Sequence, residues 1–332
     1  MYYYLKKILF QFDPETAHAV TLKSLQIAHS LGLTQFFPTV SSQPCTLMGL
    51  TFPNRIGLAA GLDKNGDYID ALATLGFGFV EVGTVTPKPQ EGNPQPRLFR
   101  LPEQEAIINR MGFNNKGCDY LAEQLRKIKF NGVIGVNIGK NRDTPIEHAL
   151  DDYLHGFRVL APYASYVAIN ISSPNTESLR ALQQAGLLKS LLKGLKAEQM
   201  LFAERKKYVP LVVKIAPDLT PDDVEDIAEI LLAEKVDGVI ATNTTVSRDG
   251  LENVPHAMES GGLSGKPLSA YSTAIIQQLS VLLKNQIPII ASGGVMNAID
   301  AAEKIAAGAS LVQLYSGLIY HGPRLIQACA AL

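Results

Sequence analysis

The chain has 332 residues, of which 46% are hydrophobic, and its 30 basic and 31 acidic side chains give a net charge of −1. This length allows one large domain or two modest ones around a sizeable core, and the balanced charge excludes a long-range field that would attract nucleic acid. The three cysteines are widely spaced and the six histidines form no HExxH motif, so neither a disulfide framework nor a metal site is expected.

Residues 1–40 are predicted to form an amphipathic helical segment. The first residues place aromatic side chains before two lysines and lack an apolar stretch with a cleavage site, so we expect no signal peptide. Asp13, Pro14 and Glu15 indicate a helix start, and Gly32 can end that helix. One apolar stripe runs between them, formed by Ala19, Leu22, Leu25, Ala28 and Leu31. No apolar run approaches the ~20 residues that cross a bilayer.

Residues 41–332 open with a polar linker and then alternate short apolar runs with longer amphipathic stretches. The predicted strands are Arg55–Ala59, Phe79–Thr84, Val133–Ile138, Tyr166–Ile171, Leu211–Ala216, Gly238–Asn243, Ile287–Ala291 and Leu311–Tyr315. The clearest predicted helices are Tyr120–Lys129, Pro221–Glu234, Ala270–Leu283 and Ala298–Ala307. This rhythm predicts an α/β fold, a (β/α)8 TIM barrel. A doubly wound sheet is the alternative, but the glycines after the first strand lack its fingerprint spacing.

Polar side chains follow nearly every predicted strand. In a barrel these positions meet at one rim, where active sites lie. Amides and hydroxyls dominate there, which suits an uncharged planar ring rich in C=O and N–H groups. Gly293 and Gly294 follow the seventh strand, in the corner where barrels bind phosphate.

Each of these residues also has an ordinary structural explanation. An asparagine at a strand end is usually a turn residue, and an isolated lysine is usually solvated. Lys214, however, lies inside the apolar run Leu211–Ala216, where a lysine is costly unless it meets a charge. The recurrence of polar groups at the ends of the predicted strands favours a cofactor site.

Five motifs in this order resemble the dihydroorotate dehydrogenase family over nearly the whole chain. They are Ala59–Lys64, Asn109–Asn114, Asn170–Thr176, Val213–Asp218 and Gly261–Gly265. The family's catalytic base is cysteine in the soluble branch and serine in the quinone-linked, membrane-associated class 2 branch. Ser173 at this position and the N-terminal helical extension both indicate class 2. One departure is Ala291-Ser292-Gly293-Gly294, where many quinone-linked members have Gly-Val-Gly-Gly.

The resemblance implies oxidation of dihydroorotate to orotate with FMN as hydride acceptor, in pyrimidine biosynthesis. Ser173 would be the catalytic base, and Thr176 and Phe113 would shape a proton relay beside it. Substrate would contact Lys64, Asn109, Arg110, Met111, Gly112, Phe113, Asn170, Asn175, Asn243 and Thr244. FMN would contact Ala60, Gly61, Leu62, Asp63, Lys64, Thr84, Asn137, Asn170, Lys214, Thr242, Gly265, Gly294, Tyr315 and Ser316. Lys214 would stabilise negative charge on the reduced flavin.

The final electron acceptor would be a membrane quinone, either ubiquinone or menaquinone. By resemblance, His18, Arg100 and Tyr315 would line the inner end of a quinone tunnel formed by the N-terminal helices. Their apolar and basic residues would rest on lipid at the cytoplasmic face of the cell membrane, without crossing it. The alternative is that these helices only cap the bottom of the barrel.

Other functions remain open at this point. The same barrel could carry a Schiff-base aldolase with Lys64 or Lys214 as nucleophile. The soluble dehydrogenase branch, which uses fumarate or NAD, is disfavoured by Ser173. A non-enzymatic scaffold would leave the polar rim unexplained. The stretch from Pro174 to Gln184 is our candidate for a mobile lid.

Overall fold

The computed structural model describes residues 2–331, and its centre is a closed barrel of eight parallel strands. The strands pair in the order β10-β12-β13-β3-β4-β7-β8-β9 before the barrel closes. Their bounds are β3 Ile56–Leu58, β4 Phe79–Val85, β7 Val133–Ile138, β8 Tyr166–Asn170, β9 Leu211–Ile215, β10 Gly238–Ala241, β12 Ile289–Ser292 and β13 Leu311–Leu314. All eight predicted strands are therefore confirmed, with shifts of one or two residues at most of their ends.

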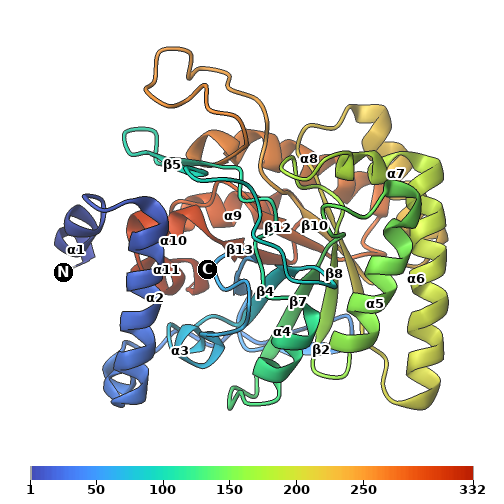
Figure 1. The fold of residues 1–332 in the computed structure, drawn as a ribbon, viewed down its shortest axis with the longest axis horizontal. Coiled ribbons are helices and arrows are strands. Elements are labelled where there is room, and N and C mark those ends of the chain that lie inside the picture. Colours follow the sequence, from blue (N-terminus) through green and yellow to red (C-terminus); the bar gives the residue numbers. More distant parts are fainter. Residues whose placement is uncertain (1, 332) are drawn as a thin grey trace.

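Helices surround the barrel, as Figure 1 shows. Their bounds are α1 Tyr2–Leu9, α2 Pro14–Ser30, α3 Ile69–Ala73, α4 Cys118–Leu125, α5 Ala149–Leu160, α6 Ala185–Arg205, α7 Pro221–Ala233, α8 Ser269–Leu283, α9 Ala298–Ala306, α10 Ser316–His321 and α11 Arg324–Ala330. The predicted start of α2 is correct, because the Asp13 side chain accepts hydrogen bonds from the backbone N–H groups of Glu15 and Thr16. The four clearest predicted helices correspond to α4, α7, α8 and α9, although α4 ends four residues earlier than predicted.

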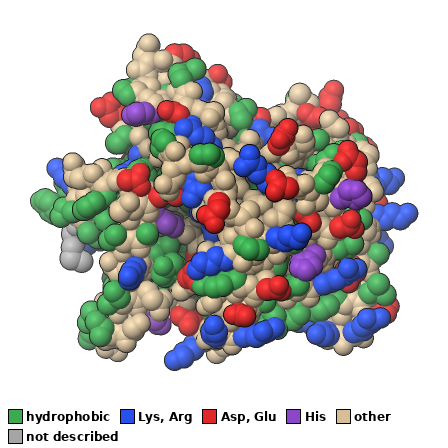
Figure 2. Space-filling view, viewed as in Figure 1, with side chains coloured by type: hydrophobic (Ala, Val, Ile, Leu, Met, Phe, Trp, Pro, Cys, Tyr) green, Lys and Arg blue, Asp and Glu red, His purple; other side chains and the backbone are tan. Residues whose placement is uncertain are grey.

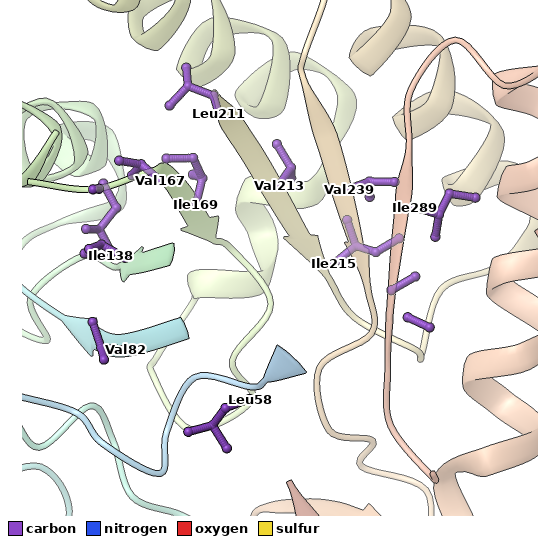
Figure 3. Packing of buried hydrophobic residues seen from close by; sticks show 14 of the residues in the cluster. Leu58, Val82, Ile138, Val167, Ile169, Leu211, Val213, Ile215, Val239 and Ile289 are labelled. Carbon is purple, nitrogen blue, oxygen red and sulfur yellow. The ribbon is translucent and has the colours of Figure 1, made fainter. Parts of the chain in front are cut away.

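The main core lies between the strands and the surrounding helices. Successive side chains of a strand point to opposite faces, so alternate positions leave the barrel and pack against the helices. Figure 3 shows part of this layer, where side chains such as Val82, Ile169 and Val213 are fully buried. Burial on both faces explains why each barrel strand is a nearly continuous apolar run.

A hairpin closes the amino end of the barrel. Strands β1 (Cys45–Leu47) and β2 (Leu50–Phe52) pair antiparallel, and Phe52 packs edge-on against Phe79 of β4 at a ring-centroid distance of 5.3 Å. The aromatic rings inside the barrel occupy space that a side chain on the neighbouring strand would fill, and glycines leave that space empty. A Cβ atom at Gly57 would lie 2.2 Å from the Phe79 ring, and one at Gly135 would lie 2.2 Å from Tyr166. Aromatic side chains and the hairpin together fill the lower half of the barrel.

A second sheet, which the sequence analysis did not predict, lies on the carboxyl side of the barrel strands. Strands β5 (Leu98–Leu101), β6 (Ala106–Asn109) and β11 (Gly262–Gly265) form it in the antiparallel order β11-β6-β5. It carries its own small cluster of buried side chains, which includes Ile108 and Leu263. This sheet forms one wall above the rim.

The N-terminal helices lie beside the barrel and do not cover its amino end (Figure 1). Helix α2 packs against α3 and β5, and Glu15 forms a two-pronged ion pair with Arg97 at 2.9 and 3.0 Å. Helix α1 packs near α10, where the Tyr2 hydroxyl donates a 2.6 Å hydrogen bond to the carbonyl of Ile319. The alternative of a cap on the barrel bottom is therefore wrong, because the β1–β2 hairpin already occupies that position.

Candidate active site

A deep cavity opens at the carboxyl ends of the barrel strands. It contains about 1220 Å³ of empty space, including solvent at its mouth. Lys64, Ser173, Lys214 and Gly294, which are far apart in the sequence, all line it. They follow or belong to four different barrel strands, so only closure of the barrel brings them together.

Most of the residues predicted for the site lie on this cavity. They are His18, Ala60, Gly61, Lys64, Thr84, Asn109, Met111, Gly112, Phe113, Asn170, Ser173, Asn175, Lys214, Thr242, Asn243, Thr244, Gly265, Gly294, Tyr315 and Ser316. Six predicted residues lie outside its lining, namely Leu62, Asp63, Arg100, Arg110, Asn137 and Thr176. Among these six, Asn137 is fully buried directly behind the wall and bonds to Thr84 and Asn170.

A set of amides forms the polar floor. Asn170 Nδ2 donates to Thr84 Oγ1 at 2.9 Å, and Asn243 Nδ2 donates to Ser172 Oγ at 3.1 Å. Above them, Asn175 Nδ2 donates to Asn109 Oδ1 at 3.3 Å. This arrangement presents both donors and acceptors to a flat heterocycle.

Two lysines bring positive charge to the cavity. Lys64 Nζ donates to the Gly61 carbonyl at 3.0 Å, and burial lowers its pKa to about 8. Lys214 has 6% of its surface exposed, and across residues 2–331 its ammonium has no hydrogen bond or ion pair. Burial lowers the pKa of Lys214, while the nearby negative charge of Glu81 opposes that shift. An ammonium in this position favours an anionic or carbonyl-rich ligand.

Glycines shape one corner of the cavity. Gly265, Gly293 and Gly294 have positive φ values of 95°, 109° and 75°. A Cβ atom at Gly294 would lie 2.2 Å from the Cα of Ser269, the first residue of α8, so only glycine fits this close approach. Backbone N–H groups beside the start of a helix are well suited to binding a phosphate group.

Ser173 also lines the cavity. Its Oγ accepts a hydrogen bond from the backbone N–H of Asn175 at 3.2 Å, and the side chain is nearly buried. Thr176 Oγ1, three residues further on, is buried and has no hydrogen-bond partner among the described residues. Buried hydroxyls are normally paired, so this atom is suited to an ordered water.

Several predicted residues have structural roles outside the cavity. The Asp63 carboxylate accepts from the backbone N–H groups of Asp67 and Tyr68, and its burial raises its pKa to about 6. Leu62 belongs to the main core. Arg110 forms a 2.6 Å ion pair with Glu259.

Arg100 lies on a second hollow, between α1 and β5. Its guanidinium donates to the carbonyls of Leu9 and Phe12 and lies 4.5 Å from the centre of the Phe10 ring. Lys6 and Lys7 also line this hollow, and Leu98 lines both the hollow and the main cavity. His18 and Tyr315, in contrast, line the main cavity.

The cavity also includes residues that the sequence analysis missed. Leu98, Ile107 and Ser264 come from the unpredicted second sheet, and Gln313 comes from β13. Gln313 is a polar residue inside an apolar strand. The same pattern identified Lys214, so Gln313 could have been predicted from the sequence. Leu98, Ile107 and Ser264 carried no such signal.

Two kinds of feature are absent from residues 2–331. Within residues 2–331, no helix is both long enough and apolar enough to cross a bilayer. In the same part of the chain, no group of three or more histidine, cysteine, aspartate or glutamate side chains is placed to hold a metal ion.

Comparison with known proteins identifies the family. Residues 43–330 match the family model described as dihydroorotate dehydrogenase. The chain is 56% identical to proteins named dihydroorotate dehydrogenase (quinone) from Nitrosospira multiformis, over 98% of this chain and 94% of that protein, and from Acinetobacter baumannii, over 99% and 98%.

Solved structures agree with this assignment. A structure of DHODH from Eimeria tenella in complex with ferulenol aligns with a TM-score of 0.87 at 39% identity, covering 96% of this chain and 90% of that one. A ligand-free form from the same organism gives 0.86 at 40% identity, covering 96% and 93%. The chain therefore belongs to the dihydroorotate dehydrogenase family, in the branch whose members are named for quinone.

Proposed function

We propose that this protein oxidises dihydroorotate to orotate with FMN as the first electron acceptor and a membrane quinone as the last, a step in the de novo synthesis of UMP. The observation that carries the proposal is the convergence of Lys64, Ser173, Lys214 and Gly294 on one cavity. The quinone name of relatives that are 56% identical over nearly the full chain supports the second half of the reaction.

The residues of the cavity fit FMN. The glycine corner with the start of α8 suits a phosphate monoester, and the unpaired ammonium of Lys214 suits the carbonyl-rich edge of the ring system. Bound FMN would supply a hydride acceptor that side chains lack. Thr84 and Asn170 would contact the ring, and buried Asn137 would hold both of them in place.

Ser173 would remove the proton from C5 of dihydroorotate, while the hydride leaves from C6. A serine hydroxyl is a weak base at neutral pH, so its proton needs an exit. The unpaired hydroxyl of Thr176 supports such an exit through a water molecule, with Phe113 shielding the path. Asn109, Asn175 and neighbouring amides would hold the substrate ring, as would Thr244.

Quinone would approach along the N-terminal helices. Their exposed surface is rich in apolar side chains, including Tyr3, Tyr4, Leu5, Ile8, Val20, Ile27, Leu31 and Phe36. In Figure 2 hydrophobic atoms gather over α1 and the adjoining part of α2. Such a surface beside Lys6 and Lys7 suits a peripheral contact with anionic lipid, which we propose at the cytoplasmic face of the cell membrane. His18 and Tyr315 would then meet the quinone inside the cavity, with Arg100 near its entrance.

The experiment is an absorption spectrum of the purified full-length protein, followed by anaerobic addition of dihydroorotate and then of a short-chain quinone. We expect a flavin spectrum that bleaches with dihydroorotate and returns with quinone. A colourless protein that is trapped on a lysine by borohydride would instead indicate the aldolase. A flavin that dihydroorotate does not bleach would contradict the proposed substrate.

A further inference from the structure

A fully buried carboxylate lies in the middle of the barrel, below the amide floor. Glu81 of β4 accepts a hydrogen bond from Asn137 Nδ2 at 2.9 Å, and its other oxygen accepts from Tyr166 Oη and Gln313 Nε2, both at 2.7 Å. These donors come from three other strands. The amide nitrogens of Asn137 and Gln313 cannot accept a hydrogen bond, so both contacts require an acceptor oxygen on Glu81.

The Glu81 carboxylate sets the orientation of the neighbouring amide groups. Since Asn137 must direct its NH₂ group to Glu81, its Oδ1 faces Thr84 Oγ1 at 2.6 Å and Asn170 Nδ2 at 3.2 Å. Asn170 must then direct its own Oδ1 away, where it accepts from Asn243 Nδ2 at 3.3 Å. A chain of hydrogen bonds with one fixed direction therefore runs from Glu81 to the cavity floor.

Among the described residues, Lys214 is the only positively charged side chain on a barrel strand. The buried charged residues within 2–331 are Asp63, Glu81, Lys140, Lys214 and Lys304. Of these, only Glu81 and Lys214 lie on barrel strands. The strand register also brings Lys214 close to this hydrogen-bond network. Lys214 of β9 lies beside Asn170 of β8, and the Asn170 amide is hydrogen-bonded to Asn137.

We propose that Glu81 is a positioning residue of the flavin site, a role that rests on the function proposed above. Its carboxylate fixes the orientation of the amides that meet the cofactor and balances the positive charge of Lys214. Without the Glu81 carboxylate, no buried negative charge on the barrel strands would offset the positive charge of Lys214 beside the flavin. The site would then favour negative charge on the ring more strongly than the natural protein does.

Substitution of Glu81 by glutamine tests the charge with little change of shape. Gln313 Oε1 is buried without a hydrogen-bond partner in the described residues, so it can accept from the new amide. The readout is the dissociation constant of sulfite, which adds to flavin N5 and leaves negative charge on the ring. In the full-length holoenzyme, Glu81→Gln should bind sulfite severalfold more tightly, and the flavin reduction potential should rise.

Tyr166→Phe is the matched control, because it removes one hydrogen bond from the same carboxylate and keeps the charge. Its sulfite affinity should stay close to that of the natural protein. Unchanged affinity in Glu81→Gln, or equal shifts in both variants, would overturn the proposal. A natural protein that contains no flavin would overturn the proposed function itself, which makes the two failures distinguishable.

Thermal unfolding provides a second test that needs no flavin. Lys214→Met leaves the Glu81 charge buried without its counter-charge, so adding Glu81→Gln should raise the melting temperature above that of Lys214→Met alone. Additive losses of stability from the two substitutions would contradict the charge balance, even if Glu81→Gln alone folded poorly.

Discussion

The contacts of Ser173 suit the role of catalytic base that we propose for it. Within residues 2–331 its hydroxyl has a single hydrogen bond, from the backbone N–H of Asn175, which leaves the oxygen able to face a substrate. The unpaired Thr176 hydroxyl lies three residues away along the same loop. In that role, Ser173 would depend on geometry and on a route for the proton, since nothing in its contacts makes the hydroxyl intrinsically basic.

Replacement of Ser173 by alanine should lower kcat by roughly 10²–10⁴-fold, because general-base catalysis is lost while the cavity remains. Flavin content should stay unchanged, since the serine is not expected to hold the cofactor. The measurement is turnover with dihydroorotate at a fixed flavin concentration. Turnover equal to that of the natural protein would remove Ser173 from the role of base.

At the scale of elements, one lysine connects two helices behind the glycine corner. Lys304 of α9 is fully buried, and its Nζ donates to Ser272 Oγ at 2.5 Å, to Thr273 Oγ1 at 2.7 Å and to the Ser269 carbonyl at 2.7 Å, all in α8. Ser272 in turn donates to the carbonyl of Gly293 at 2.9 Å. The start of α8 and the glycine turn are thus fixed by the same side chain.

Lys304→Met should reduce the free energy of unfolding by about 1–3 kcal/mol, because it leaves buried oxygen atoms with fewer donors. Urea denaturation of the variant and the natural protein measures the difference. Thr220→Ala, which removes an exposed cap of α7, provides a reference for an ordinary local loss. A Lys304→Met protein as stable as the natural one would show that this connection contributes little.

A second prediction at the scale of elements concerns the N-terminal helices. A chain that begins at Ser42 lacks α1 and α2 but keeps the complete barrel. We expect it to retain flavin bleaching by dihydroorotate and to lose most of its reaction with quinone. Stopped-flow measurement of each half-reaction separates the two effects. Quinone reduction at the rate of the full chain would exclude a tunnel formed by these helices.

At the scale of the whole molecule, the pH dependence of stability reports how α2 docks on the barrel. His18 lines the cavity, and burial, followed by the positive charge of Lys64, lowers its pKa from 6.5 to about 4. The unfolded chain therefore binds a proton at His18 between these two values, while the folded chain does not. This contribution to stability is fully present above pH 6.5 and is lost as the pH falls toward 4.

His18→Gln should accordingly show a smaller loss of melting temperature than the natural protein when the pH is lowered from 7 to 4. Comparing the two proteins cancels the contribution of Asp63, whose raised pKa acts in the opposite direction over part of this range. Parallel melting curves for the two proteins would show that His18 is as accessible to protons in the folded state as in the unfolded chain.

The barrel was predictable from the sequence because each of its strands is buried on both faces and leaves an apolar run. Strands β5, β6 and β11 were not, because β5 is only partly buried, and β6 and β11 pair although they lie far apart in the chain. Lys214 stood out as a charge inside an apolar strand. Glu81 has the same pattern, but only the structure shows its three donors and its link to the amide floor.

Because the β1–β2 hairpin closes the amino end of the barrel, only the carboxyl end is open to ligands. Any molecule that reaches the amide floor must arrive from the carboxyl side of the strands, where the second sheet contributes residues to the cavity wall. In the function proposed above, a polar metabolite and a lipid-soluble oxidant would therefore both reach the cavity from that side, without passing through the barrel. Substitutions around that opening would therefore change access to the cavity without disturbing the packed lower half of the barrel.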